Sequence, residues 1–195
     1  MKCCAVVVAA GLSSRMKSFK PLLPICGRPA IVHLLHTLFS AGVSHCIVVT
    51  GHRHEDIQRV CASLDSITFV HNPNYAVTQM FDSARLGFAA VPPDCNRVLF
   101  TPADVPLIPS EVVATLTERD DPLLFPSYQM RRGHPMALDS TYLPYLLTYT
   151  GPGGLRGALA LLPIPPAYLV VNDPRVLLDM DTPSDYQTLL QFNTH

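Results

Sequence analysis

CCAVVVAAG (residues 3–11) is the first apolar run of the chain, and it continues as LSSRMKSFKPLLPICGRPA (residues 12–30). A short apolar run that ends in glycine indicates a buried β-strand followed by a turn. No Asp or Glu precedes Glu55, whereas four cationic side chains follow this turn, namely Arg15, Lys17, Lys20 and Arg28. The first strand therefore leads into a loop of unbalanced positive charge, which suggests an anionic ligand.

Strand-like and helix-like segments alternate along the rest of the chain. Apolar runs predict strands at residues 45–50, 67–70, 97–101 and 122–126. Apolar residues spaced three and four apart predict helices at residues 29–42, 54–64 and 79–91. After residue 125 the predicted pieces are shorter, with strands at 133–138 and 167–171 and helices near 141–147, 153–162 and 183–190. This alternation predicts one α/β domain with a mostly parallel sheet and helices on both faces.

The bulk composition narrows the possible functions. The 195 residues carry a net charge of −1, which argues against a general nucleic-acid-binding protein. The longest apolar runs are far too short to span a membrane, so we expect no membrane partner. The six cysteines show no CxxC spacing, and the N-terminus resembles a strand rather than a secretion signal. We therefore expect a cytoplasmic protein with reduced, mostly buried thiols.

The topology of a parallel sheet predicts where a ligand would bind. Ligands of such sheets bind beyond the carboxyl ends of the strands. This rule brings residues 9–20, 51–54 and 101–105 to one edge. The cationic loop and Asp104, which is held between prolines, should therefore share one crevice.

The loop itself has the chemistry of a phosphate site. The small residues Ala9, Ala10 and Gly11 would let the backbone approach a ligand, and the Ser13 hydroxyl adds a hydrogen-bond donor. Arg15 could bind phosphate oxygens with two parallel hydrogen bonds, and Lys20 supplies a mobile point charge. The alternative is an exposed loop whose charges are only solvated. The sequence contains neither a Walker motif nor a GxSxG nucleophile elbow.

The tail carries acidic residues in VLLDMDTPSDY. Asp179 and Asp181 alternate along an extended segment, so only one of them should face the crevice. Mg²⁺ takes one or two carboxylates plus substrate phosphates, so Asp104 and one of this pair would suffice. Alternatively, Asp181 or Thr182 caps the last helix. Metal binding and helix capping can both occur in this segment if different residues perform them.

The histidines give weaker signals. His33 and His36 lie three apart on a helix with no further metal ligand, so packing is the better interpretation. His52 and His54 follow a strand at the crevice, and contact with a ligand stays open for them. His134, in RRGHP, is a candidate for a phosphate contact.

Five ordered segments resemble one known family. VVAAGLSSRM…KPLLPICGRP resembles the AAGxSxRMGxxKxLLPxxGxP signature of nucleotidyltransferases, specifically the molybdenum cofactor cytidylyltransferase-like branch. TPADVPLI is similar to the family's PADxPLV, and HNPNYAVTQMFDSARLGF to NPxYxxGMxxSLRxGL. RRGHPMAL is similar to RGHPxLF, and LDMDTPSDY to DIDTPEDY. These matches extend over nearly the whole chain.

The resemblance implies a single three-layer, Rossmann-like nucleotidyltransferase domain, with the NTP bound by residues 1–110 and the acceptor by residues 111–195. Arg15 and Lys20 would hold the triphosphate and, with Asp104, form the catalytic set. Asp104 and Asp181 would bind Mg²⁺. The nucleotide would also contact the backbone of residues 9–11, Ser13, and the loop that contains Gln79 and Ser83. Arg132 and His134 would contact the acceptor.

The reaction implied is transfer of CMP from CTP to a phosphomonoester such as molybdopterin, with release of pyrophosphate. Alternatives are transfer to a sugar phosphate or another phosphorylated alcohol, or a non-catalytic nucleotide-binding regulator. The expected partners are the NTP and a phosphorylated small molecule, and a molybdoenzyme or its maturation factor, but no nucleic acid. Three residues depart from the family pattern. Lys17 bears on loop geometry, Gln79 on base selection and Pro152 on acceptor binding.

Overall fold

The first apolar run forms an interior strand of a mixed sheet. The computed structural model describes residues 2–16 and 18–192, so Lys17 lies outside the described residues. Within these ranges, eight strands form one sheet in the order β10-β7-β9-β6-β1-β4-β5, with β8 paired to β7. They are β1 (Cys3–Ala9), β4 (His45–Thr50), β5 (Ile67–His71), β6 (Arg97–Pro102), β7 (Leu123–Tyr128), β8 (Arg131–Arg132), β9 (Met136–Asp139) and β10 (Ala167–Val170). A separate two-stranded sheet joins β2 (Pro24–Ile25) to β3 (Arg28–Pro29).

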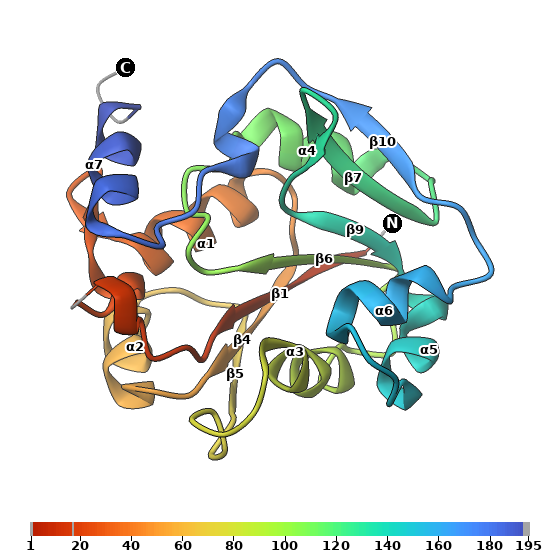
Figure 1. The fold of residues 1–195 in the computed structure, drawn as a ribbon, viewed down its shortest axis with the longest axis horizontal. Coiled ribbons are helices and arrows are strands. Elements are labelled where there is room, and N and C mark those ends of the chain that lie inside the picture. Colours follow the sequence, from red (N-terminus) through yellow and green to blue (C-terminus); the bar gives the residue numbers. More distant parts are fainter. Residues whose placement is uncertain (1, 17, 193–195) are drawn as a thin grey trace.

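Strand directions confirm the predicted parallel core and add two reversed strands, β9 and the short β8, which is antiparallel to β7. β1 is parallel to both β4 and β6, β4 is parallel to β5, and β10 is parallel to β7. β9 lies between β6 and β7 and is antiparallel to both. The carboxyl ends of β1, β4 and β6 consequently meet at one edge of the sheet (Figure 1).

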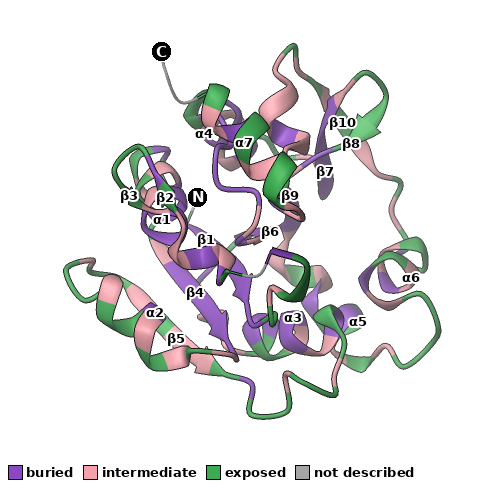
Figure 2. Ribbon diagram, turned by 60° about the vertical axis from the view of Figure 1, so that its left-hand side comes forward, coloured by how far each residue is buried: buried purple, intermediate pink, exposed green. Residues whose placement is uncertain are grey.

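Helices cover both faces of this sheet (Figure 1). They are α1 (Ala30–Ser40), α2 (His54–Val60), α3 (Met80–Ala89), α4 (Ser110–Glu118), α5 (Leu143–Thr148), α6 (Gly154–Ala160) and α7 (Pro183–Gln191). Because side chains alternate along a strand, β1 serves two cores. Cys3, Ala5 and Val7 pack with α1, α2 and α4, whereas the intervening residues pack with α3, α5 and α6. β1 and β4 are accordingly buried along their length (Figure 2).

The C-terminal segment returns to the N-terminal part of the chain. A third apolar cluster joins Ile25, Leu107, Met180 and Leu189. The hydroxyl of Tyr186 on α7 donates to the carbonyl of Pro24 at 2.6 Å. This packing holds the DMD segment beside the loop that follows β1.

Most predicted elements are present, with bounds that differ by a few residues. The segment at residues 54–64 is helical only over α2, and the one near 141–147 begins as a 3₁₀ turn (Ser140–Tyr142) before α5. Helix α4 was not predicted, because its valines and threonines weaken the helical signal. Of the six cysteines, all within the described ranges, five are buried and Cys26 is exposed. No helix among the described residues is long and apolar enough to cross a membrane.

Candidate active site

A cavity of about 210 Å³ opens at the edge where β1 and β6 end. The turn after β1 forms one wall, the residues after β6 another, and the start of α3 a third; the lining includes Ala9, Ala10, Gly11, Ser13, Lys20, Tyr75, Thr78, Gln79, Met80, Ser83 and Asp104. Gly51, at the end of β4, lets the walls approach. A Cβ atom there would lie 2.6 Å from the carbonyl oxygen of Ala10 and 2.5 Å from Cβ of Tyr75.

Ser13 sets the shape of the cationic loop. Its backbone has a positive φ of 55°, and its carbonyl accepts a hydrogen bond from the amide of Met16 at 3.1 Å. Its hydroxyl accepts a second bond from the amide of Lys20, also at 3.1 Å. Met16 and Phe19 are buried and anchor the loop. These contacts fix the backbone from which Lys20 extends.

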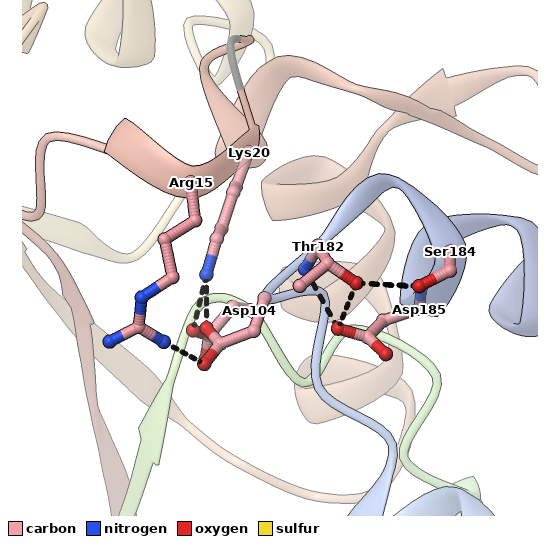
Figure 3. Close-up of polar contacts among 7 residues, drawn as sticks. Arg15, Lys20, Asp104, Thr182, Ser184 and Asp185 are labelled. Atoms are coloured by element: carbon pink, nitrogen blue, oxygen red, sulfur yellow. Dashed lines mark hydrogen bonds and ion pairs between the residues drawn. The ribbon is translucent and has the colours of Figure 1, made fainter.

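Arg15 and Lys20 meet two carboxylates that come from distant parts of the chain (Figure 3). Lys20 Nζ lies 2.6 Å from Oδ1 of Asp181 and 3.2 Å from Oδ2 of Asp104. Arg15 Nη1 lies 2.7 Å from the other oxygen of Asp181. The Lys20 side chain is 12% exposed and that of Arg15 is 73% exposed. Two of the cations that are unbalanced in the sequence, Arg15 and Lys20, are thus paired in the fold.

The last helix holds Asp181 in position without using it as a cap. The Thr182 hydroxyl caps α7, and the Asp185 carboxylate accepts from the Thr182 amide at 2.7 Å (Figure 3). The amide of Met180 donates to the carbonyl of Asp104 at 2.9 Å, which ties this segment to the end of β6. Capping therefore falls to Thr182, and Asp181 is left for the ion pairs.

The two acids of the DMD segment have opposite electrostatics. Hydrogen bonding from Lys20 lowers the pKa of Asp181, with Arg15 contributing in the same direction. Desolvation, followed by repulsion from Asp181 and Asp104, raises the pKa of Asp179. Asp181 is accordingly the carboxylate stabilised as an anion in the crevice.

The start of α3 presents Gln79 and Ser83 to the cavity, but each also has a structural role. The Gln79 side chain accepts from the helix backbone, and the amide of Gln79 donates to Asp82 Oδ2 at 2.9 Å, which completes a capping box. Ser83 is buried, and its hydroxyl accepts from the Asn72 side-chain amide at 2.9 Å. The glutamine that departs from the family's glycine thus finds its partners within the helix cap.

A second cavity, of about 640 Å³, adjoins the first, since Met80 lines both. Its walls are mainly apolar and aromatic, from residues such as Phe100, Leu123, Phe125, Met136, Leu155 and Ile164, with Arg132, His134 and Arg156 as the polar contributors. The guanidinium carbon of Arg132 lies 4.9 Å from the ring centroid of Phe125. Arg132 Nε donates to the Tyr168 hydroxyl at 3.1 Å. These contacts hold Arg132 against Phe125, which also lines this cavity.

His134 differs from a surface phosphate ligand. Its Nδ1 atom is buried and has no hydrogen-bond partner, while its backbone amide donates to the carbonyl of Val176 at 2.8 Å. Burial lowers the pKa of its ring, so the imidazole is neutral near pH 7. A neutral ring next to an apolar wall suits a hydrogen bond to a ligand better than a charge contact.

The remaining histidines of the crevice make internal contacts. The His52 ring packs between Phe19 and Tyr75, with centroid distances of 5.4 Å and 6.0 Å. His54 Nδ1 lies 2.6 Å from the Thr50 hydroxyl. Since Tyr75 lines the first cavity, His52 supports its wall from behind.

Comparison with known proteins assigns the family. Residues 5–168 match the MobA-like NTP transferase domain. The chain belongs to this family. It is 28% identical over 188 residues to the molybdenum cofactor cytidylyltransferase of Escherichia coli (strain K12), which covers 94% of this chain and 93% of that protein.

Solved structures share the fold of this MobA-like protein. A nucleotidyl transferase from Methanothermobacter superposes with a TM-score of 0.84 at 24% identity, over 98% of this chain and 97% of that one. A manganese complex of Rv0371c from Mycobacterium tuberculosis gives 0.78 at 22% identity, over 98% and 99%. The Rossmann-like three-layer fold and the nucleotidyltransferase class expected from the sequence are therefore confirmed.

The donor set of this MobA-like site fits a divalent metal that shares its coordination with substrate. Within residues 2–16 and 18–192, no group of three or more His, Cys, Asp or Glu side chains is arranged to hold a metal. Asp104 and Asp181 supply two carboxylates held by the same lysine. Mg²⁺ and Mn²⁺ prefer oxygen ligands, and Mg²⁺ in particular uses few protein carboxylates together with phosphates.

Sequence reasoning named most of this site but missed its supports. Asn72, Tyr75 and Thr78 were not singled out, although Tyr75 and Thr78 line the cavity and Asn72 holds Ser83. The family's NPxY segment contains both Asn72 and Tyr75 and could have indicated them.

Proposed function

We propose that this MobA-like protein transfers CMP from CTP to a phosphomonoester such as molybdopterin and releases pyrophosphate. The observation that carries the proposal is the meeting of Arg15 and Lys20 with Asp104 and Asp181 at the cavity beside β1. The E. coli relative, whose name states cytidylyl transfer, supports the choice of CTP.

The nucleotide would enter the first cavity. The turn of residues 9–11 offers backbone groups without bulky side chains, which suits a base and ribose held against the end of β1. Arg15 and Lys20 would turn from the carboxylates to the triphosphate. Arg15 is exposed and would lie at the mouth of the cavity, whereas Lys20 is half-buried and would lie inside it.

Asp104 and Asp181 would hold the divalent cation, for which we propose Mg²⁺. When bound, such a cation neutralises charge on the phosphates. The carboxylates come from segments joined by the bond between the Met180 amide and the Asp104 carbonyl, so their spacing is maintained by the backbone. The manganese complex of Rv0371c supports a metal in this fold.

The chain's residues would act mainly by alignment and by charge. A phosphomonoester oxygen is already anionic near neutral pH, so its attack on the α-phosphorus needs no protein base. The P–O bond to the departing pyrophosphate breaks as the new P–O bond forms. Lys20 and Arg15 would stabilise the charge that moves onto the pyrophosphate.

The second cavity favours an acceptor with a ring system that can pack on apolar and aromatic side chains over a sugar phosphate. Sugars need several hydrogen-bonding side chains, whereas this cavity is lined mainly by aliphatic and aromatic groups. Arg132, held against Phe125 and Tyr168, would meet the negative charge of the acceptor. The neutral His134 would hydrogen-bond the acceptor's ring. We accordingly propose that residues 1–110 bind the NTP and residues 111–195 the acceptor.

Pyrophosphate release tests this proposal. Each of the four NTPs is incubated with Mg²⁺ and with molybdopterin, a sugar 1-phosphate or no acceptor. We expect release with CTP and molybdopterin, and none from Asp104→Asn under the same conditions. Release with the sugar phosphate instead would replace the acceptor assignment. Nucleotide binding without release for any combination would indicate a regulator and refute the enzymatic proposal.

A further inference from the structure

Lys20 occupies the space between the two carboxylates proposed to hold metal. Its ammonium contacts Asp181 at 2.6 Å and Asp104 at 3.2 Å, and its side chain is largely shielded from solvent. Arg15 takes the second oxygen of Asp181. Two anions are thus matched by two cations in the free protein, and a metal that approached alone would meet an ammonium where it needs oxygen ligands.

We propose that Lys20 is an internal competitor of the divalent cation, so that the cation binds tightly only together with a nucleoside triphosphate. This inference rests on the proposed nucleotidyl-transfer site. A divalent cation added alone would place a third positive group beside Lys20 and Arg15, and Coulomb repulsion at such distances weakens binding. A metal–triphosphate complex instead brings anionic oxygens to which both side chains can turn.

The loop allows this exchange through the side chain alone. The Lys20 amide is held by the Ser13 hydroxyl, and the following Pro21 is buried. The four-carbon stem of lysine has freely rotating bonds, so its ammonium can leave the carboxylates while the backbone stays in place. Arg15, with most of its side chain in solvent, has still fewer restraints. The competitor is consequently expected to move without unfolding of the phosphate loop.

Manganese binding, followed by the electron paramagnetic resonance signal of free Mn²⁺, tests the competition without an activity assay. The wild-type protein should bind Mn²⁺ weakly alone and much more tightly with CTP. Lys20→Met removes the ammonium and keeps a similar length, so its affinity for Mn²⁺ without nucleotide should rise by about tenfold or more. Arg15→Met, at the exposed position, is the matched control and should have a smaller effect.

A carboxylate variant tests whether the gain in Mn²⁺ affinity arises at this site. Asp104→Asn added to Lys20→Met should abolish the gain in Mn²⁺ affinity, and Lys20→Gln should reproduce the gain if the methionine variant folds poorly in a thermal melt. Unchanged or weaker Mn²⁺ binding by both folded Lys20 variants would overturn the inference. Tightening of Mn²⁺ binding by GTP but not CTP would leave the inference standing and refute the assignment of CTP.

Discussion

Gly87 lies where α3 crosses the sheet. Its replacement by alanine should lower the free energy of unfolding and should also disturb the first cavity, the proposed nucleotide site. A Cβ atom at this position would lie 2.5 Å from Cγ1 of Val6 and 2.7 Å from Cγ2 of Val49, both fully buried. Overpacking of this kind costs about 1–3 kcal/mol. The better helix propensity of alanine returns up to about 1 kcal/mol. We therefore expect a net loss of up to about 2 kcal/mol in the free energy of unfolding.

Urea unfolding of a mutant cycle isolates the steric cause. Val49→Ala removes a methyl group that the new Cβ would meet, so the double variant Gly87→Ala/Val49→Ala should be less destabilised than the sum of the single variants by about 1 kcal/mol. Ala89→Gly, on the exposed side of the same helix, is the control and changes propensity without a clash. Strictly additive losses would refute the steric reasoning.

Gly87→Ala also tests whether the packing of α3 on the sheet affects the first cavity. The first turn of α3 carries residues that line the first cavity, in which we propose that the nucleotide binds, among them Met80 and Ser83. A helix pushed away from β1 and β4 by Gly87→Ala should therefore bind CTP more weakly while it remains folded, as measured by calorimetric titration. Unchanged CTP affinity in a destabilised variant would mean that the sheet, rather than α3, absorbs the displacement.

Three further predictions concern single side chains. Arg15→Ala and Lys20→Ala should each lower kcat at saturating CTP, by about tenfold or more, because preorganised charges of this kind stabilise the departing pyrophosphate; steady-state kinetics that show only a higher KM would assign them to binding alone. Asp181→Ala should abolish turnover and Asp179→Ala should not, since Asp181 is ion-paired with both Arg15 and Lys20, and the reverse pattern would exchange their roles. Burial lowers the folded-state pKa of His134, so its contribution to stability is complete above the unfolded value of about 6.5 and is lost as the pH falls through the folded pKa. Urea unfolding at several pH values should show a smaller acid-side loss in His134→Asn, and an unchanged pH dependence would contradict the burial argument.

The longer strands were predictable from the sequence because their apolar runs are short and bounded by turn residues. The two-residue strands β2, β3 and β8 were not predicted, because they contain no apolar run. The direction of β9 was not, since a run such as MAL packs equally well in a parallel or an antiparallel strand. Its reversal follows from the long-range pairing with β6 and β7. Helix α4 escaped prediction for a local reason, because Val112, Val113 and Thr115 favour strands in isolation and become helical by packing on α1.

The site was predictable where a rule of topology or a family motif applied. The ends of β1 and β6 placed Lys20 and Asp104 at one edge, and the family motif selected Asp181 over Asp179. The ion pairs were not predictable, because Lys20 lies 84 residues from Asp104 and 161 from Asp181. The same holds for the buried Nδ1 atom of His134 and for the bond from its backbone amide to the carbonyl of Val176, which belongs to a distant segment. Contacts between distant segments, rather than local pattern, decide these features.

The fate of each phosphate of CTP tests the proposed cytidylyl transfer most directly. The protein is incubated with Mg²⁺, molybdopterin and CTP labelled separately at the α- and γ-phosphates. The proposal predicts that the α-label moves onto the acceptor while an equal amount of γ-label leaves as pyrophosphate. Release of the γ-label as orthophosphate, or retention of both labels in CTP while the nucleotide is bound, would contradict it.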